Sequence, residues 1–188
     1  QNIRNVVLLG STKSGKTTLS EAMLYEGKVI DRRGTVEGKN TVSDNAEIEQ
    51  INQRSVYATP LYAEFMDTKF NIIDTPGADD FVGGAVSAFK VCDTGVLVVN
   101  AQQGVEVGTQ IYSRYAKEYN IPLIAAVNQL DGEKANWEGT LESMKEAFGN
   151  KPVVVQYPVE VGPGFDGFID VLKMKYYRFE GDTGKRQD

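Results

Sequence analysis

The stretch Gly10-Ser11-Thr12-Lys13-Ser14-Gly15-Lys16-Thr17 fits the pattern G-x-x-x-x-G-K-[ST]. Residues 6–9, just before it, are a short apolar run with β-branched side chains, as in a strand buried on both faces of a parallel sheet. Residues 18–25, just after it, favour a helix. A strand, a glycine loop and a helix in this order aim backbone N–H groups and the positive helix end at one anion. The stretch therefore predicts a phosphate-binding loop, and a glycine turn that binds nothing is the weaker alternative.

The side chains of this loop have separate expected roles. The Lys16 ammonium would reach the β- and γ-phosphates of a nucleotide, and the Thr17 hydroxyl would be a ligand of Mg²⁺, which prefers oxygen donors. The residues predicted to surround the phosphates are Gly10, Ser11, Thr12, Lys13, Ser14, Gly15, Lys16, Thr17 and Thr18.

Composition limits the kinds of protein this can be. A chain of 188 residues with 41% hydrophobic content can form one domain with one core. Its net charge of −6 argues against sequence-specific nucleic acid binding. No apolar run approaches the ~20 residues of a membrane helix and no leader pattern is seen, so we expect no membrane partner. The single cysteine, Cys92, cannot form an internal disulfide, which favours a reducing compartment. The chain has no histidine, which removes the commonest general base and metal ligand.

Apolar strand-like runs alternate with amphipathic helical runs, which predicts an α/β fold. We expect the three-layer αβα P-loop NTPase (GTPase) fold with a mostly parallel sheet. Residues 57–65 contain a proline and turn directly into 69–74, so they are predicted to form an antiparallel edge strand. The expected strands are 5–9, 57–65, 69–74, 95–100, 121–127 and 152–156. The expected helices are 16–25, 80–91, 106–119 and 134–148.

Two regions fall outside this alternation. Residues 26–56 are rich in Gly, Asn, Asp, Arg and Glu with no lasting period, and a connection of that length is expected to be functional and mobile without its ligand. Residues 157–164 read as a loop, and 165–172 as one short helix. Residues 174–179 read as a strand with no visible partner in the chain.

A second candidate motif, Asp74-Thr75-Pro76-Gly77, follows the 69–74 strand, where a doubly wound sheet presents residues to a ligand. Asp74 would hold Mg²⁺ through a water. The Gly77 N–H, with no Cβ in the way, would approach a γ-phosphate and respond to its presence. A plain turn is the alternative interpretation, but the position one strand beyond the glycine loop favours the functional one.

A third motif, Asn128-Gln129-Leu130-Asp131, follows the 121–127 strand and resembles the guanine-reading Asn-Lys-x-Asp of GTPases. A carboxylate at Asp131 can accept two parallel hydrogen bonds from guanine N1–H and the 2-amino group, which adenine does not present. Gln129 replaces the usual lysine, whose stem packs along the base. The three motifs in this order predict a guanine-nucleotide-binding domain.

Longer stretches resemble the G domain of the elongation factor G family, the ribosomal translocases. They are 2–5, leading into the glycine loop, 71–77 with Asp80 and Phe81, and 165–175, which is similar to the segment leading into the subdomain inserted in that family's G domain. The resemblance implies GTP and GDP as ligands with Mg²⁺, the ribosome as partner of a multidomain, cytoplasmic factor, and a G domain that continues beyond residue 188. We expect the protein to be a monomer. On this view 157–188 begin the inserted subdomain, and 26–56 are the family's switch-one segment.

The chain also departs from the family pattern. Ala78 stands where the family has a histidine that positions the attacking water, beside the γ-phosphate-sensing Gly77. Removing such a group commonly loses about 10²–10⁴ in rate, so weak or absent GTP hydrolysis is expected. Ser55 stands where a threonine closes on Mg²⁺ and keeps that oxygen. Arg54 replaces an apolar residue and is expected to be a solvated loop arginine, while Lys13 replaces an aspartate. The alternatives are an active GTPase that uses Arg54, Lys13 or a ribosomal group, and a GTP-binding factor that protects or remodels ribosomes.

Overall fold

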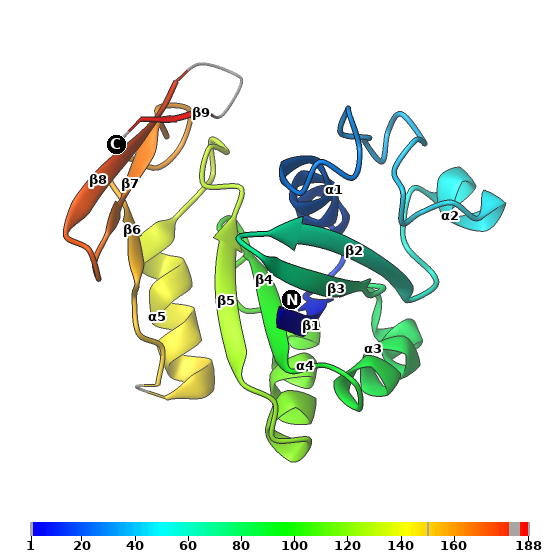
Figure 1. Ribbon diagram of the computed structural model, residues 1–188. Helices are drawn as coiled ribbons and strands as arrows, with labels where there is room; N and C mark the ends of the chain where they lie inside the picture. The colour runs from blue at the N-terminus through cyan, green and yellow to red at the C-terminus, as the bar shows by residue number, and fades with distance from the viewer. Residues whose placement is uncertain (1, 150, 181–184, 188) are drawn as a thin grey trace. The chain divides into compact units, whose positions relative to one another are not determined.

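The computed structural model describes residues 2–149, 151–180 and 185–187, and within them β1 lies in the middle of a five-stranded sheet of order β2-β3-β1-β4-β5 (Figure 1). The strands are β1 (Asn2–Leu9), β2 (Thr59–Phe65), β3 (Thr68–Asp74), β4 (Thr94–Asn100) and β5 (Leu123–Asn128). β1 pairs in parallel with both β3 and β4, and β2 pairs antiparallel with β3 at the edge. Residues 6–9 are all buried, as expected of a strand covered on both faces. The predicted mostly parallel sheet with an antiparallel edge strand is confirmed.

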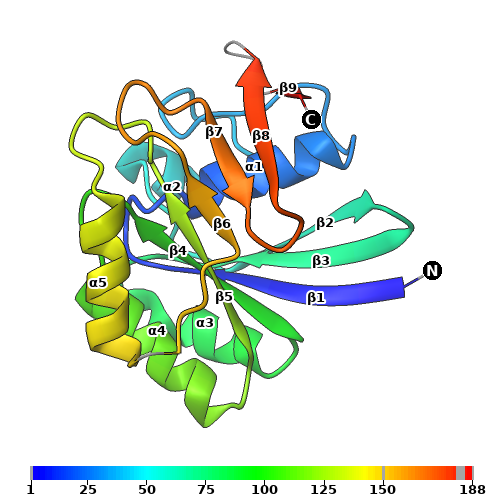
Figure 2. The same ribbon diagram turned by 90° about the vertical axis from the view of Figure 1, so that its left-hand side faces the viewer.

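Helices cover both faces of this sheet. They are α1 (Lys16–Glu26), α3 (Val82–Phe89), which follows a short 3₁₀ turn (Asp79–Phe81), and α4 (Val107–Glu118). Both views show α1 on one face and α3 and α4 on the other (Figures 1 and 2). Under α1, the apolar core contains Val6, Leu8, Ala63 and Ile72. The expected three-layer αβα fold is therefore confirmed.

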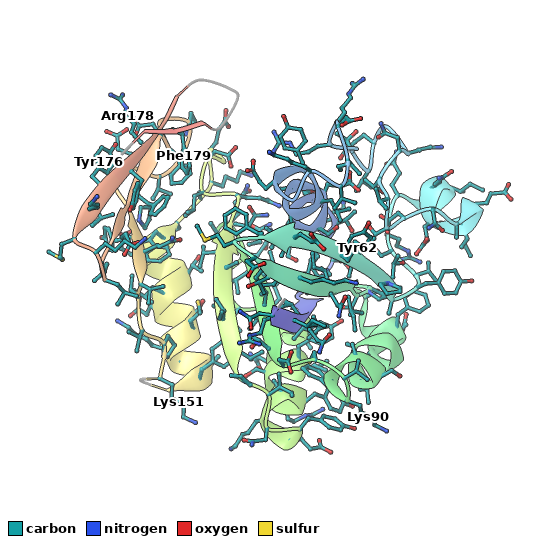
Figure 3. The ribbon with its side chains drawn as sticks, in the orientation of Figure 1. Tyr62, Lys90, Lys151, Tyr176, Arg178 and Phe179 are labelled. Atoms are coloured by element: carbon teal, nitrogen blue, oxygen red, sulfur yellow. The ribbon has the colours of Figure 1, made fainter. Side chains whose placement is uncertain are left out.

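The chain divides into two compact units, of which the sheet just described belongs mainly to the first (residues 1–99 and 106–126). The second unit (residues 100–105 and 127–188) contains α5 (Trp137–Phe148). Its described residues also form a four-stranded antiparallel sheet of β6 (Gln156–Pro158), β7 (Gly167–Asp170), β8 (Lys175–Glu180) and β9 (Lys185–Gln187). Along β8, Tyr176 and Arg178 share one face and Phe179 lies on the other (Figure 3). The Arg178 Nε donates to Asp166 Oδ2 at 2.8 Å.

Three sequence predictions in the second unit are wrong. Residues 165–172 do not form a helix, because 167–170 are strand β7. Residues 174–179 are not an unpartnered strand, since β8 pairs with both β7 and β9. The strand predicted over 152–156 is displaced: residues 152–155 lie outside any strand, and β6 runs from Gln156 to Pro158, into the stretch 157–164 that was predicted as a loop. For β7 and β8 the reason is packing: the Phe168 ring lies 5.4 Å from that of Tyr177 and 5.8 Å from that of Phe179, and such cross-strand contacts favour an extended backbone over a helix.

The long segment after α1 contains an unpredicted helix, α2 (Glu47–Asn52), and is tied to α1 by a buried carboxylate. Glu21 accepts the backbone N–H of Gly34 at 2.7 Å and that of Val42 at 2.6 Å. Two such bonds, to a charged acceptor, fix the path of the chain between residues 34 and 42. The mobility of 26–56 stays a prediction.

Across the described residues, none of the helices combines the length and the apolar character needed to cross a membrane.

Candidate functional site

The glycine loop closes around the side chain of Lys16. Gly10 has φ +141°, and a Cβ there would collide with the Val98 carbonyl oxygen of β4. Gly15 has φ +98° at the start of α1, a conformation that L side chains rarely adopt. Lys16 is 5% exposed, and its Nζ donates to the carbonyls of Gly10 at 2.8 Å and Ser11 at 3.0 Å. The two glycines therefore let the loop turn back over the ammonium.

The electrostatics of this loop favour an anionic ligand. Burial lowers the pKa of Lys16 from 10.5 to about 8, while the carboxylates of Asp74, Asp44 and Glu106 act in the opposite direction. A buried ammonium that is only partly compensated binds a further negative charge favourably. This is what a phosphate would supply.

The residues predicted to bind metal come together beside the loop. The Thr17 hydroxyl donates to Asp74 Oδ2 at 3.0 Å and lies 3.2 Å from the Ser55 hydroxyl. Asp44, which sequence reasoning missed, is buried in the same place, and its carboxylate accepts a hydrogen bond from Ser55. Burial raises the pKa of Asp74 to about 6, against the effects of Lys16 and of the Ser43 and Thr17 hydroxyls. Burial likewise raises the pKa of Asp44.

This cluster suits a hard divalent cation. Within the described residues, Asp74 Oδ1 and Asp44 Oδ2 are buried and receive no hydrogen bond. All the available donors are oxygens, the type that Mg²⁺ prefers. The described part of the chain has no set of three or more Asp, Glu, His or Cys side chains that could hold a metal by itself. The residues therefore fit Mg²⁺ held by hydroxyls, carboxylates and ligand oxygens together.

The turn after β3 lies directly against the glycine loop. A Cβ added to Gly77 would press on Lys16 Nζ and lie 2.7 Å from the Thr12 backbone nitrogen. The turn is fixed from both sides, because the Thr75 hydroxyl donates to the Leu8 carbonyl at 2.6 Å and the Tyr112 hydroxyl donates to the Pro76 carbonyl at 2.9 Å. Ala78 follows in an extended conformation and is half-buried. Sequence reasoning found Gly77 but gave Tyr112 no role.

Replacing Gly77 by Ala is expected to weaken binding of a phosphate-containing ligand at least about tenfold and to destabilise the fold by about 1–3 kcal/mol, since the new methyl group meets backbone atoms as well as Lys16. Gly83→Ala is the matched control, because a Cβ at this exposed helical position meets nothing within 4 Å. That variant should instead gain about 0.5–1 kcal/mol from helix propensity. Thermal unfolding and nucleotide titration of both variants check this. Equal behaviour of the two would contradict the close approach of Gly77.

The remaining predicted residues are less constrained. Thr18, Lys13 and Arg54 are exposed, and Lys13 has φ +64°. The exposure of Arg54 agrees with the expectation of a solvated loop arginine.

In the second unit, Asn128 and Gln129 are half-buried and Asp131 is exposed. Gln129 has φ +60°, and its Oε1 accepts from Asn100 Nδ2 at 3.0 Å. The Asn128 carbonyl accepts the Ala101 N–H at 2.9 Å. That Asn128, Gln129 and Asp131 bind the base stays a prediction.

The site defines a P-loop domain of the GTPase fold. Its glycine loop lies between β1 and α1 and contains a buried lysine, and a cluster of hydroxyls and carboxylates lies at the end of β3. Residues 1–182 match the family "Elongation factor Tu GTP binding domain", and the chain belongs to this family. It is an elongation-factor-G-like GTP-binding domain.

Individual relatives place it within that family. The chain is 36% identical over its whole length to an elongation factor G-like protein of Thermotoga maritima and 32% identical, again over all of it, to elongation factor G of Mycoplasma pneumoniae. It covers 27% of each relative. A crystal structure of a Thermus thermophilus protein superposes with a TM-score of 0.91 and 32% identity, covering 99% of this chain and 28% of that one. The chain thus spans about a quarter of the length of the proteins it matches.

Proposed function

We propose that this domain binds GTP and GDP with Mg²⁺ as part of an elongation-factor-G-like translation factor that acts on the ribosome as a cytoplasmic monomer. The observation that carries the proposal is the convergence of Lys16, Thr17, Ser55 and Asp74 at one place, although they come from separate stretches of sequence. The relatives named elongation factor G support the ribosomal role.

Each residue of the site has a task in this proposal. Lys16 releases the loop carbonyls and binds the β- and γ-phosphates. Thr17 and Ser55 would hold Mg²⁺ directly and Asp74 through a water, and the ion when bound neutralises phosphate charge. The Gly77 N–H would donate to the γ-phosphate, so that the turn after β3 distinguishes GTP from GDP. Asn128 and Asp131 would read the guanine.

We further propose that the domain hydrolyses GTP slowly. The residue after Gly77 is Ala78, and the chain has no histidine at all. A methyl group neither orients a water nor stabilises developing charge, so the loss relative to a competent enzyme is about 10²–10⁴ in rate. Slow hydrolysis would keep GTP bound longer than in relatives that carry the histidine.

Titration of the full-length protein with GTP, GDP and ATP in the presence of Mg²⁺ tests the binding proposal. GTP and GDP should bind at least about 10²-fold more tightly than ATP, because adenine offers no pair of donors to Asp131. Asp131→Ala should remove most of this difference, while Glu133→Ala, an exposed neighbour, should leave it unchanged. Equal affinity for GTP and ATP in the unmodified protein would refute guanine recognition.

A further inference from the structure

Helix α2 buries a carboxylate and exposes its isoleucines. Glu49 is 1% exposed, whereas Ile48 and Ile51 are 49% and 66% exposed. A surface helix normally does the reverse, because burial of its apolar side chains is what stabilises it. Six residues are also too few for a helix to be stable alone. The contacts of Glu49 must therefore supply much of what holds this helix in place.

The Glu49 side chain accepts backbone hydrogen bonds from residues before α2 and from residues after it. Its Oε2 accepts the N–H of Ala46, just before α2, at 3.2 Å. Its Oε1 accepts the N–H groups of Val56 at 2.9 Å and Tyr57 at 3.0 Å, which lie beyond the end of α2. The Glu49 carbonyl also accepts the Arg54 N–H at 3.2 Å. Hydrogen bonds to a charged acceptor are stronger than those between neutral groups. The Glu49 carboxylate therefore holds the backbone before α2 and the backbone after it close together.

Ser55 lies between two residues whose backbone N–H groups donate hydrogen bonds to Glu49. Arg54 and Val56, its two neighbours, both donate their N–H groups to Glu49. Gln53, with φ +50°, ends α2 and turns the chain back toward the glycine loop. The Ser55 hydroxyl then reaches 3.2 Å from the Thr17 hydroxyl. Glu49 therefore fixes the backbone on both sides of the hydroxyl that this segment places against the start of α1.

We propose that Glu49 is a positioning residue that holds Ser55 at the Mg²⁺ and γ-phosphate site and thereby sets the preference for GTP over GDP. This inference rests on the proposed function, since it assigns Ser55 to the GTP state. A contact made only in that state contributes only to GTP affinity. Loosening Ser55 should thus weaken GTP binding and leave GDP binding almost unchanged.

The test uses two measurements on the full-length protein carrying Glu49→Ala, Glu49→Gln or Glu47→Ala. The first is hydrogen exchange of the Val56 and Tyr57 amides without nucleotide, and the second is the ratio of GTP to GDP affinity with Mg²⁺. Glu49→Ala should speed exchange and lower the ratio about tenfold. Glu49→Gln keeps an amide oxygen for Val56 and Tyr57, so its ratio should stay within about threefold of the unmodified protein. Glu47→Ala removes the same charge from an exposed position of α2 and should change neither.

The outcomes separate this inference from the function on which it rests. Unchanged amide exchange in Glu49→Ala, or a loss of GDP affinity as large as that of GTP, would overturn the positioning role. A fall in the Glu49→Gln ratio as large as that of Glu49→Ala would also overturn it, because charge rather than backbone anchoring would then be responsible. If the unmodified protein bound neither nucleotide while Glu49→Ala still sped exchange, the anchor would stand and the proposed function would fall. Should Glu49→Ala fail to fold, Glu49→Gln still tests the positioning role, because a fall of about tenfold in its ratio of GTP to GDP affinity would overturn it.

Discussion

Replacing Asp74 by Asn is expected to stabilise the nucleotide-free protein at pH 7 and to weaken its Mg²⁺-dependent GTP binding at least about tenfold. The carboxylate is 1% exposed and carries a charge that its surroundings only partly compensate. Asn keeps an oxygen for the Thr17 and Ser20 hydroxyls, which donate to Oδ2 at 3.0 and 3.4 Å. Its amide nitrogen takes the place of Oδ1, the atom that among described residues receives no hydrogen bond.

The raised pKa of Asp74 determines how the free energy of unfolding depends on pH, and so whether Asp74→Asn stabilises the protein. The pKa of Asp74 is 3.8 unperturbed and about 6 in the folded protein, because burial disfavours the charged form. Between these values the folded state keeps a proton that the unfolded state has lost. The contribution of this Asp74 proton to the free energy of unfolding is therefore complete below pH 4 and is lost as pH rises through 6. The change is on the order of 3 kcal/mol. The Asn side chain leaves a buried N–H to satisfy and deprives Lys16 of an attractive partner, so a net gain of about 1–2 kcal/mol is expected at pH 7.

Chemical unfolding between pH 4 and 8 without Mg²⁺, together with GTP titration with Mg²⁺, measures both halves of this prediction. The unmodified protein should lose stability between pH 4 and 6, and Asp74→Asn should show a flatter profile over that range. Asp31→Asn, which removes the same charge from an exposed position, should follow the unmodified protein. Parallel profiles of Asp74→Asn and the unmodified protein would contradict the raised pKa of Asp74.

The parts of the site that depend on local pattern were predictable from sequence. The glycine loop needs small residues and a lysine at fixed spacing, and Asp74 ends a strand next to the one that precedes the loop. Ser55 was found by its spacing in a family pattern. These residues are recognisable because their backbone conformation or chemistry leaves few alternatives at each position.

The groups that hold the site in place were not predictable. Asp44, Glu21 and Glu49 are buried carboxylates, and acidic residues in a polar segment are normally solvated. The partners of Glu21 and Glu49 are backbone N–H groups, which leave no trace in residue type. β7 was missed for a related reason, because apolar spacing over 165–172 fits a helix as well as a short strand, and only the pairing with β8 decides.

Replacing Ala78 by His is expected to raise the rate of ribosome-dependent GTP cleavage by about 10²–10⁴, the largest change we predict for a single substitution. The backbone can accept it: Ala78 has φ −84° and ψ 137°, extended values open to any residue, and its carbonyl accepts the Phe81 N–H at 3.0 Å whatever the side chain. The position is half-buried and directly follows Gly77, whose backbone lies against the glycine loop. An imidazole there would supply the hydrogen-bonding group that the methyl lacks.

Single-turnover cleavage of GTP by the full-length protein on ribosomes measures this rate. Ala78→Leu is the control, since it adds bulk at the same place but no hydrogen bond, and it should be no faster than the unmodified protein. GTP and GDP affinities should stay within about threefold in Ala78→His, because Ala78 contributes no binding group. A rate that is already fast in the unmodified protein would disprove slow hydrolysis. If Ala78→His is no faster than Ala78→Leu, the missing imidazole does not limit the reaction. Arg54 and Lys13, whose side chains are exposed, would then be the alternative catalytic groups to replace.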